Sequence, residues 1–419
     1  MNTASNADAS DGPGVAPPGW WPLWGLFCAC SWTWCIGMYL PRILLDRYGW
    51  AGFVAFLIPN VLGCAALGYV LRTPDRARAI IERHRPWALA FSFVTVAYHA
   101  FFAVFLAVRL LPRDGAFALN GGSGAGPAAE HVALAAGLLL ALGLVGGLLS
   151  RLGDRAWLGL AAAVYGTSLL VLAVLLTRPS ALPEVPLVLD GAELATLLPV
   201  IVLGFLLCPY LDLTFLRAHR ASAGTHAFGV FGATFAVMLG LTCVLWFQQG
   251  PALGAWALLH LGLQATFTVG AHLRELATHA RGGGLVRGAL LVGPFAVGLG
   301  FAAAATTPLV GEGTYMRFLA AYGLVFPAAV LWLVARPSPS APGERRRDAI
   351  AVLLACALLA PLHELGFVGR VTGATLPAAG VAAIAIVLVL ARRRAAAGTT
   401  VDSGGGEPDP PARPATIDA

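Results

Sequence analysis

Asp212 is an acidic side chain inside a long apolar run, the stretch from Ile201 to Arg217. Three residues before it, Pro209 has no N–H, so the carbonyl four residues further back loses its helical partner. The helix is therefore predicted to bend or open at this point. A freed carbonyl, a carboxylate and the hydroxyls of Tyr210 and Thr214 together suit a cation or a polar solute at membrane depth.

Asp212 also allows a structural interpretation. Arg217 follows it after about 7–8 Å of helix rise, so the carboxylate is within reach of interfacial water. Arg217, His219 and Arg220 would then anchor the end of the span as a basic cluster on the cytoplasmic side. The sequence leaves both interpretations open, a site within the membrane or an interfacial acid.

A second set of polar side chains recurs every four residues between Trp256 and His272. His260, Gln264, Thr268 and His272 form a slowly drifting stripe on one helix face, which must look inward because lipid would not solvate it. Thr266 adds a second hydroxyl, although it points to a different side of a regular helix. The stripe either lines a solute pathway or forms interhelical hydrogen bonds of about 0.6 kcal/mol each.

Two further apolar runs carry similar groups. In one, Ser92, Thr95 and His99 are spaced i, i+3, i+7, and His99 is expected to be neutral and hydrogen-bonded because it lies near mid-span. The other contains Trp32 and Trp34, which lie too deep for an interfacial belt. Ser31 and Thr33 beside them mark a partly unwound segment that exposes carbonyls, or else the two tryptophans serve packing alone. The tryptophans that fit an interfacial belt are Trp20, Trp21 and Trp24.

The composition is that of a polytopic membrane protein. Of 419 residues, 58% are hydrophobic and 11% charged, against about 25% charged in soluble domains. All 27 basic residues are Arg, which we attribute to the codon bias of a GC-rich, bacterial genome. The 7 cysteines fall inside apolar runs, where a thiol behaves as a small hydrophobe, so neither a disulfide framework nor a zinc site follows.

About 20 apolar residues cross a hydrocarbon core, and the hydropathy pattern predicts twelve transmembrane helices. Their approximate bounds are 20–41, 49–72, 87–111, 131–150, 155–177, 193–216, 223–248, 252–273, 285–307, 314–335, 349–367 and 371–391. Most arginines fall in the connections after the even-numbered spans and in the C-terminal tail, which places both termini in the cytoplasm. The fold class is therefore all-α, with every connection alternating between the two sides of an inner membrane.

The spans are predicted to form two five-helix halves and two extra helices. An odd number of spans per half makes the second half run inverted, which places a binding site between the halves near the midplane. The predicted divisions are a disordered tail at 1–19, a first repeat at 20–177, an external linker at 178–192, a second repeat at 193–335, two extra helices at 336–394 and a disordered tail at 395–419.

Several residues suit helix packing or interfaces more than chemistry. Asn60, next to the helix-bending Pro59, is expected to bridge two helices. The pair His363 and Glu364 is expected to lie at the external interface. The glycines expected to permit close helix packing are Gly143, Gly147, Gly293, Gly298 and Gly300.

The hairpin from Trp34 to Phe53, with its Gly, Pro and following Gly, resembles the first span of the amino acid–polyamine–organocation superfamily. The resemblance implies that superfamily's fold of two inverted five-helix repeats, and sodium/solute symporters are the branch to compare first. It also implies a sodium site between unwound carbonyls of span 1 and hydroxyls of span 8, here Ser31 or Thr33 with Thr266 and Thr268. The hydroxyl pair departs from the adjacent dyad usual in sodium-coupled members, and span 5 has no Lys to support proton coupling.

These observations favour a secondary transporter that moves a small polar or zwitterionic solute by alternating access, with sodium or a proton as coupling ion and no other cofactor. The expected partners are the lipid bilayer and a small solute, and no nucleic acid. The residues expected to bind solute are Trp32, Trp34, Ser92, Thr95, His99, Tyr210, Asp212, His260 and Gln264. The alternatives are a membrane-embedded sensor on a transporter-like scaffold, and a membrane enzyme, for which the charged clusters at the span ends hold too few groups.

Overall fold

The computed structural model describes residues 20–107, 129–177, 191–222, 225–247, 251–304, 312–335 and 342–369, together with 371 and 374. Regular structure in these residues is entirely helical, with no strand. The predicted tails, most of the external linker and nearly all of the twelfth span lie outside the described residues.

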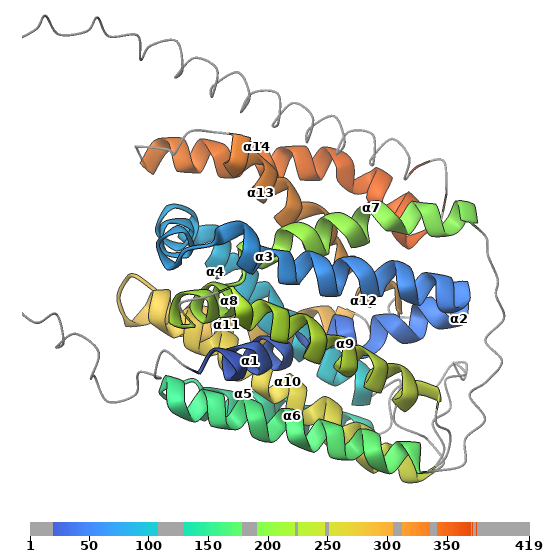
Figure 1. Cartoon of the computed structure of the whole chain (residues 1–419). Helices are drawn as coiled ribbons and strands as arrows, with labels where there is room; N and C mark the ends of the chain where they lie inside the picture. The colour runs from blue at the N-terminus through green and yellow to red at the C-terminus, as the bar shows by residue number, and fades with distance from the viewer. Residues whose placement is uncertain are drawn as a thin grey trace, which may run out of the picture.

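The helices are bundled side by side (Figure 1). In the first part of the chain they are α1 (Trp21–Trp32), α2 (Cys35–Ile58), η1 (Pro59–Gly63), α3 (Cys64–Leu71), α4 (Pro74–Phe105), α5 (Ala129–Leu149) and α6 (Asp154–Leu176). In the second part they are α7 (Gly191–Leu207), η3 (Cys208–Tyr210), α8 (Leu213–Ala221), α9 (His226–Phe247), α10 (Pro251–His279), α11 (Gly284–Ala304), α12 (Glu312–Ala320), η4 (Ala321–Val325), α13 (Phe326–Ala335), α14 (Pro342–His363) and η5 (Glu364–Val368).

The helices confirm a multi-pass membrane protein. In the described residues 7 stretches are long and apolar enough to cross a membrane, or up to 8 if the bent pair Leu198–Tyr210 and Leu213–Ala221 forms one span. One of these stretches, Cys35–Leu71, has 37 residues, about 55 Å of helix rise, which exceeds a hydrocarbon core of about 30 Å. It changes direction at Gly49, whose φ of 58° and ψ of −154° are open to glycine. The kink separates the first and second predicted spans.

Helix α4 begins much earlier than the predicted third span. It starts at Pro74 and includes a non-helical residue, His84, with φ −118° and ψ 21°. The segment before His84 is rich in exposed Arg, and the segment after it is the predicted span. Hydropathy did not indicate a helix in the first segment, because its many charged side chains leave no clear pattern of apolar residues at helical spacing.

Helix α1 lies at the centre of the bundle, packed against α6, α8, α9 and α10 (Figure 1). Every residue from Phe27 to Trp32 is buried. Trp24 is also fully buried, so its predicted place in an interfacial belt is wrong, whereas Trp20 and Trp21 are exposed as that belt requires.

Only some of the glycines predicted to permit close helix packing lie at close helix contacts. A Cβ on Gly298 of α11 would lie 2.3 Å from the carbonyl oxygen of Ala97 in α4, and one on Gly293 would lie 3.1 Å from Phe93. These two glycines let α4 and α11 approach closely. The same prediction is wrong for Gly147 and Gly300, where a Cβ would meet nothing within 4 Å, and for Gly143, whose nearest neighbour would be Phe295 at 4.0 Å.

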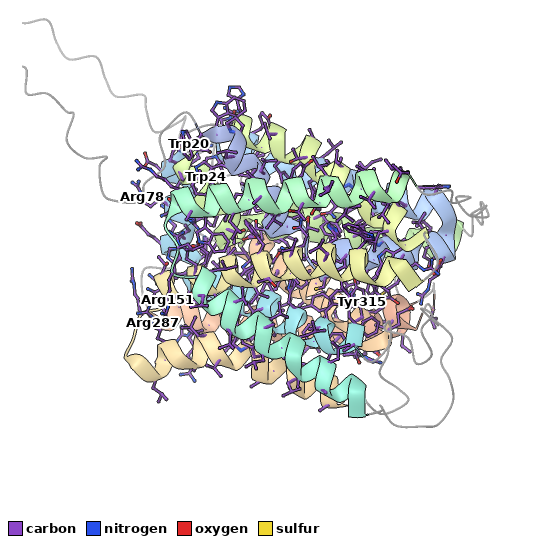
Figure 2. The ribbon with its side chains drawn as sticks, turned by 90° about the horizontal axis from the view of Figure 1, so that it is seen from below. Trp20, Trp24, Arg78, Arg151, Arg287 and Tyr315 are labelled. Atoms are coloured by element: carbon purple, nitrogen blue, oxygen red, sulfur yellow. The ribbon has the colours of Figure 1, made fainter. Side chains whose placement is uncertain are left out.

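One end of the bundle is rich in arginine. Arg78, Arg151 and Arg287 lie together at that end, far from Tyr315 near the other (Figure 2). Arg78 and Arg151 come from connections that the sequence places in the cytoplasm, and Arg287 lies at the start of the ninth predicted span, next to another such connection. The Arg-rich end thus matches the predicted grouping of the even-numbered connections, and it gives the two ends of the bundle distinct chemistry.

Candidate functional site

The first predicted span is broken at its centre. Helix α1 ends at Trp32, Thr33 has ψ 69°, Trp34 is extended with ψ 174°, and α2 begins at Cys35. No Gly or Pro causes this break. Side chains bond to the last carbonyls of α1 instead. Thr33 Oγ1 donates to the carbonyl of Ala29 at 2.7 Å, beside the Thr33 N–H, and Trp34 Nε1 donates to that of Ser31. The predicted unwinding is confirmed.

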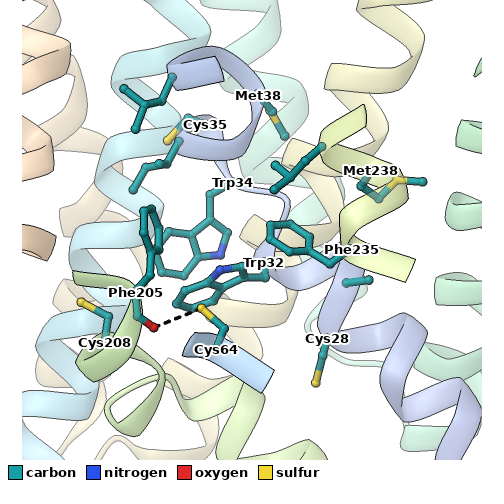
Figure 3. Packing of buried hydrophobic residues seen from close by; sticks show 14 of the residues in the cluster. Cys28, Trp32, Trp34, Cys35, Met38, Cys64, Phe205, Cys208, Phe235 and Met238 are labelled. Atoms are coloured by element: carbon teal, nitrogen blue, oxygen red, sulfur yellow. Dashed lines mark hydrogen bonds between the residues drawn. The ribbon is translucent and has the colours of Figure 1, made fainter. Parts of the chain in front are cut away.

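The sixth predicted span is also broken, at the position predicted from Pro209. Helix α7 gives way to the 3₁₀ turn η3, and the chain bends by 50° before α8. The carbonyl of Phe205, which Pro209 leaves without its helical N–H, accepts from the thiol of Cys64 on α3 at 3.3 Å (Figure 3). A neighbouring helix thus satisfies this carbonyl.

Asp212 lies in this second break and begins α8. Its Oδ1 accepts from the backbone N–H of Thr214 at 2.7 Å and lies 2.8 Å from that residue's hydroxyl, as an N-cap does. The side chain is fully buried, which excludes the interfacial interpretation. Its Oδ2 has no hydrogen-bond partner among the described residues, and a buried carboxylate oxygen left unpaired is costly unless it meets a cation or a proton.

The two breaks touch each other. Thr214 Oγ1 lies 3.1 Å from Ser31 Oγ, and the ring of Trp32 lies 4.8 Å from that of Phe215. Trp32 also donates from Nε1 to Asn60 in the π-helical turn η1 at 2.8 Å, which confirms Asn60 as a bridge between helices. Polar groups of two segments far apart in sequence are therefore gathered at one buried point.

Aromatic rings surround this point. Trp34 packs against Trp32 with ring centroids 4.1 Å apart, against Phe91 of α4 at 5.3 Å and against Tyr322 of η4 at 5.1 Å. Figure 3 shows the indoles of Trp32 and Trp34 side by side between the helices. The ring of His272 adds a T-shaped contact with Trp34 at 6.0 Å. We call these six rings, Phe215 included, the aromatic cluster.

The polar stripe on α10 faces inward, as predicted, and all four of its side chains are fully buried. They reach three different helices, however. His260 Nδ1 and Gln264 Nε2 each lie 3.0 Å from Ser168 Oγ of α6. Thr268 Oγ1 donates to the carbonyl of Cys30 beside the first break at 3.2 Å. The residues of the stripe therefore form hydrogen bonds to neighbouring helices. Of the three described so far, only Thr268 bonds next to a break.

The remaining member of the stripe meets the polar residues of α4. His272 Nδ1 lies 3.1 Å from Ser92 Oγ, and Thr95 Oγ1 lies 3.0 Å from the hydroxyl of Tyr322. His99 Nδ1 bonds to the carbonyl of Thr95 at 2.8 Å, which agrees with a neutral ring. Ser92 and Thr95 thus bond to two members of the aromatic cluster, His272 and Tyr322.

Two predicted site residues take no part in the contact between the two breaks. Tyr210 is half-buried in η3 and lines a groove between α4 and α13, beside Arg76 and Val334. Thr266 is half-buried on a different side of α10 from Thr268 and forms no side-chain hydrogen bond with the described residues. Of the four predicted sodium ligands, Ser31 lies at the first break and Thr268 bonds to the carbonyl of the adjacent Cys30. Thr33 bonds to the carbonyl of Ala29 in α1, and Thr266 forms no such contact.

The predicted basic anchor at Arg217 is wrong, because this side chain is buried. Its guanidinium donates to Asp154 of α6 at 2.6 Å and to Glu275 of α10 at 3.3 Å. It also lies over the ring of Trp24 in α1, 5.4 Å from the centroid. Arg274 joins the network by donating to Asp154 at 2.9 Å. The network ties α1, α6, α8 and α10 together at the Arg-rich end.

Tyr315 and Tyr322 are further site residues that the sequence reasoning missed. Tyr315 donates its hydroxyl to the carbonyl of Cys35, just after the first break, at 3.0 Å, and accepts at its own carbonyl from Tyr98. The carbonyl of Tyr322, in a π-helical turn, accepts from Cys208 at 3.1 Å. Their spacing of seven in an apolar span was the available signal.

A narrow apolar vestibule leads from the two tryptophans of the break to the opposite end of the bundle. Its walls come from α2, α7 and the α12–η4 segment, and Arg47 lies at its outer part. Arg47 pairs with Glu312. The space open to the centres of water-sized molecules is about 30 Å³, enough for about two waters.

The described residues can be compared with the donor sets that hold transition metals. Among the described residues, no group of three or more His, Cys, Asp or Glu side chains could hold a metal ion. The 7 cysteines are all buried and free. What the two breaks offer is one carboxylate, hydroxyls and main-chain carbonyls, which are ligands for hard cations or polar solutes.

No protein-family model and no curated protein matches the chain. Solved structures of the manganese transporter of Eremococcus coleocola are similar to it at 14% identity, covering 95% of this chain and 99% of that one. The complex with an aromatic bis-isothiourea substituted compound has a TM-score of 0.36, and a variant of the same transporter has 0.39. Scores below 0.5 do not establish a common fold, so the chemistry of the site has to follow from its own residues.

Proposed function

We propose that the chain is a secondary transporter that moves a small polar or zwitterionic solute through the space between its two broken helices. The observation that carries this proposal is the contact between the breaks, with Thr214 Oγ1 at 3.1 Å from Ser31 Oγ and the buried Asp212 beside them. Broken helices at membrane depth expose carbonyls and helix ends, and such backbone is tolerated where it is buried in protein or lines a cavity.

The placement of the breaks supports an inverted repeat. One break lies in the first predicted span and the other in the sixth, so each predicted five-helix half begins with a broken helix. In such an arrangement the two broken helices lie together at the interface of the halves. We propose this 5+5 organisation for residues 20–177 and 193–335, followed by two extra helices.

Asp212 is proposed to bind the coupling ion or to carry the coupling proton. Its Oδ2 is unpaired among the described residues, and the salt bridges of the described residues do not include Asp212. A sodium ion bound to Asp212 would also be coordinated by the carbonyl oxygen of Cys30 and the hydroxyl oxygens of Ser31 and Thr268. Thr266 is not part of this set.

Alternating access requires that the two ends open in turn. The vestibule at Arg47 approaches the breaks from one end, and the Arg217 network closes the other end by joining α1 and α8, the outer halves of both broken helices. We propose that this network separates when the site opens toward the Arg-rich end, and that this end faces the cytoplasm of an inner membrane.

Uptake by the purified full-length protein in proteoliposomes tests the proposal. A panel of amino acids, amines, betaines and other small polar solutes is offered with a sodium gradient, with a proton gradient and with neither. We expect accumulation of at least one class that depends on a gradient. Ligand-induced thermal stabilisation without flux under any gradient would instead support a sensor, and absence of both would contradict the proposed site.

A further inference from the structure

A groove on the outer surface of the bundle separates α5 from α11. Both helices pack against α4 and α10, and α10 forms the floor between them. The groove has a volume of about 1390 Å³, larger than the 300–1,000 Å³ or so of ordinary small-molecule pockets. Its walls are mainly leucine and other apolar side chains, including Leu140, Leu144, Leu148, Val292, Phe295 and Leu299.

The wall on α5 is hollowed by two glycines that touch little of the protein. A Cβ on Gly147 would meet nothing within 4 Å, and one on Gly143 would reach only Phe295, at 4.0 Å. The neighbouring Leu144 is 60% exposed and Leu148 is 62% exposed. A long apolar chain could therefore lie against the α5 backbone without displacing protein atoms.

Positive charge gathers at one end of this groove. Arg151, Arg274 and Arg287 line it there, and Arg151 and Arg287 both lie at the Arg-rich end in Figure 2. Arg274 is neutralised by Asp154 and Glu275. Arg151 and Arg287 are exposed and form no ion pair with the described residues.

We propose that this groove is a binding site for an anionic phospholipid. The acyl chains lie between α5 and α11, and the headgroup phosphate lies between Arg151 and Arg287, since guanidinium groups bind phosphate oxygens through charge-assisted hydrogen bonds. Basic pockets between transmembrane helices hold anionic lipid headgroups in this way. A zwitterionic lipid would place the positive group of its headgroup near the two arginines. A soluble phosphate would make no contact with the apolar walls. The site is independent of transport.

Native mass spectrometry of the full-length protein in detergent tests this. Phosphatidylglycerol, phosphatidylcholine with the same acyl chains, and glycerol 3-phosphate are titrated separately. We expect phosphatidylglycerol to bind at the lowest concentration. The double variant Arg151→Gln/Arg287→Gln should weaken its binding about tenfold or more, from about 1 kcal/mol for each arginine near the surface.

A second variant keeps the test valid if the first is poorly folded. Gly147→Leu should fill the groove and reduce phosphatidylglycerol binding, while improving helix propensity. Arg281→Gln/Arg346→Gln removes two exposed arginines that do not line the groove, and Gly166→Leu fills open space on α6. Both controls should bind as the wild type does. Wild-type binding by both site variants, or equal binding of phosphatidylcholine or glycerol 3-phosphate, would overturn the proposal.

Discussion

At the scale of single residues, Asp212 has two separable functions. Its Oδ1 caps α8 through the N–H and hydroxyl of Thr214, while Oδ2 remains without a partner among the described residues. An asparagine retains an oxygen for the cap, since Asn and Asp cap helices about equally well. It removes the negative charge that a coupling ion would need.

We therefore expect Asp212→Asn to lower gradient-driven uptake by about tenfold or more, equivalent to losing an interaction of about 1.4 kcal/mol, with little change in folded yield. Uptake in proteoliposomes and the monodispersity of purified protein measure the two effects. Asp212→Ala is the comparison, because it removes the cap as well and should cost about 1 kcal/mol of stability. Equal loss of uptake and yield in Asp212→Asn would assign the residue to structure alone.

The two threonines on α10 provide a matched pair. Thr268 donates to the carbonyl of Cys30, whereas Thr266 makes no side-chain hydrogen bond with the described residues. Thr268→Val should therefore weaken the response of uptake to sodium, and Thr266→Val should leave it unchanged. The measurement is uptake as a function of sodium concentration. A larger effect at Thr266 would restore the ligand set implied by the resemblance and contradict the one proposed from the geometry.

Individual site residues could be predicted only where a polar side chain within a membrane span has to face the protein interior. A buried carboxylate after a helix-breaking proline, and a stripe of His, Gln and Thr, must face inward whatever the fold. The sequence could not say which neighbour each one meets. Arg217 pairs with residues 58 and 63 positions away, and the periodicity of one helix contains no information on such partners.

At the scale of helices, the two breaks have different causes. Pro209 made the second one predictable, because a missing N–H must disrupt the helix. The first has no such residue and depends on side chains that compete for backbone groups, together with the packing of Trp32 against Phe215. Hydroxyl residues near deep tryptophans were only an indirect signal for it.

Removal of Arg217 tests the network that joins α1, α6, α8 and α10. Arg217→Met leaves the buried Glu275 with only one guanidinium contact, the longer one to Arg274 at 3.7 Å, and breaking a buried pair costs up to about 3–5 kcal/mol. We expect a clear drop in melting temperature, partly restored in Arg217→Met/Glu275→Leu. The control is Arg78→Met, since Arg78 forms an exposed pair with Asp75 at 3.0 Å, worth about 1 kcal/mol or less. Equal melting temperatures for both single variants would contradict a structural network.

The contact between α4 and α11 is tested by two glycines on one helix. Gly298→Ala would force a methyl group against the α4 backbone, and such overpacking costs about 1–3 kcal/mol. Gly300→Ala meets open space and should be neutral or stabilise by up to about 1 kcal/mol. Thermal unfolding of the purified variants measures both. A destabilised Gly300→Ala with an unaffected Gly298→Ala would show that the helices pack through a different face.

At the scale of the whole molecule, the helices place basic groups at one end, in agreement with the predicted topology. The number of spans and the inverted repeat remain predictions, because 7 or up to 8 spans are found in the described residues and nearly all of the predicted twelfth span lies outside them. Hydropathy predicts which segments enter the membrane, and it says nothing about how those segments pack around one another.

The orientation is tested by labelling with a membrane-impermeant thiol reagent in intact cells. The native cysteines are buried and should give little background. Arg281→Cys should react only after permeabilisation, since its connection is predicted to be cytoplasmic. Asp114→Cys, in a connection predicted to be external, should react in intact cells. The reverse pattern would invert the molecule in the membrane and exchange the assigned openings.

The π-helical turns determine where the chain can lose a single residue without shifting its helices. Each such turn accommodates one more residue than an α-helical turn, so η4 behaves as a single-residue insertion in the helix that carries Tyr322. Deleting Leu324 would restore the ordinary α-helical pitch and leave the two sides of that helix in register, so the carbonyls of the turn would return to partners within the helix. The bond from Cys208 to the Tyr322 carbonyl would then be lost. Relatives of this protein with a one-residue gap at η4 are therefore expected to lack this contact between η3 and η4, even if every side chain around it is the same.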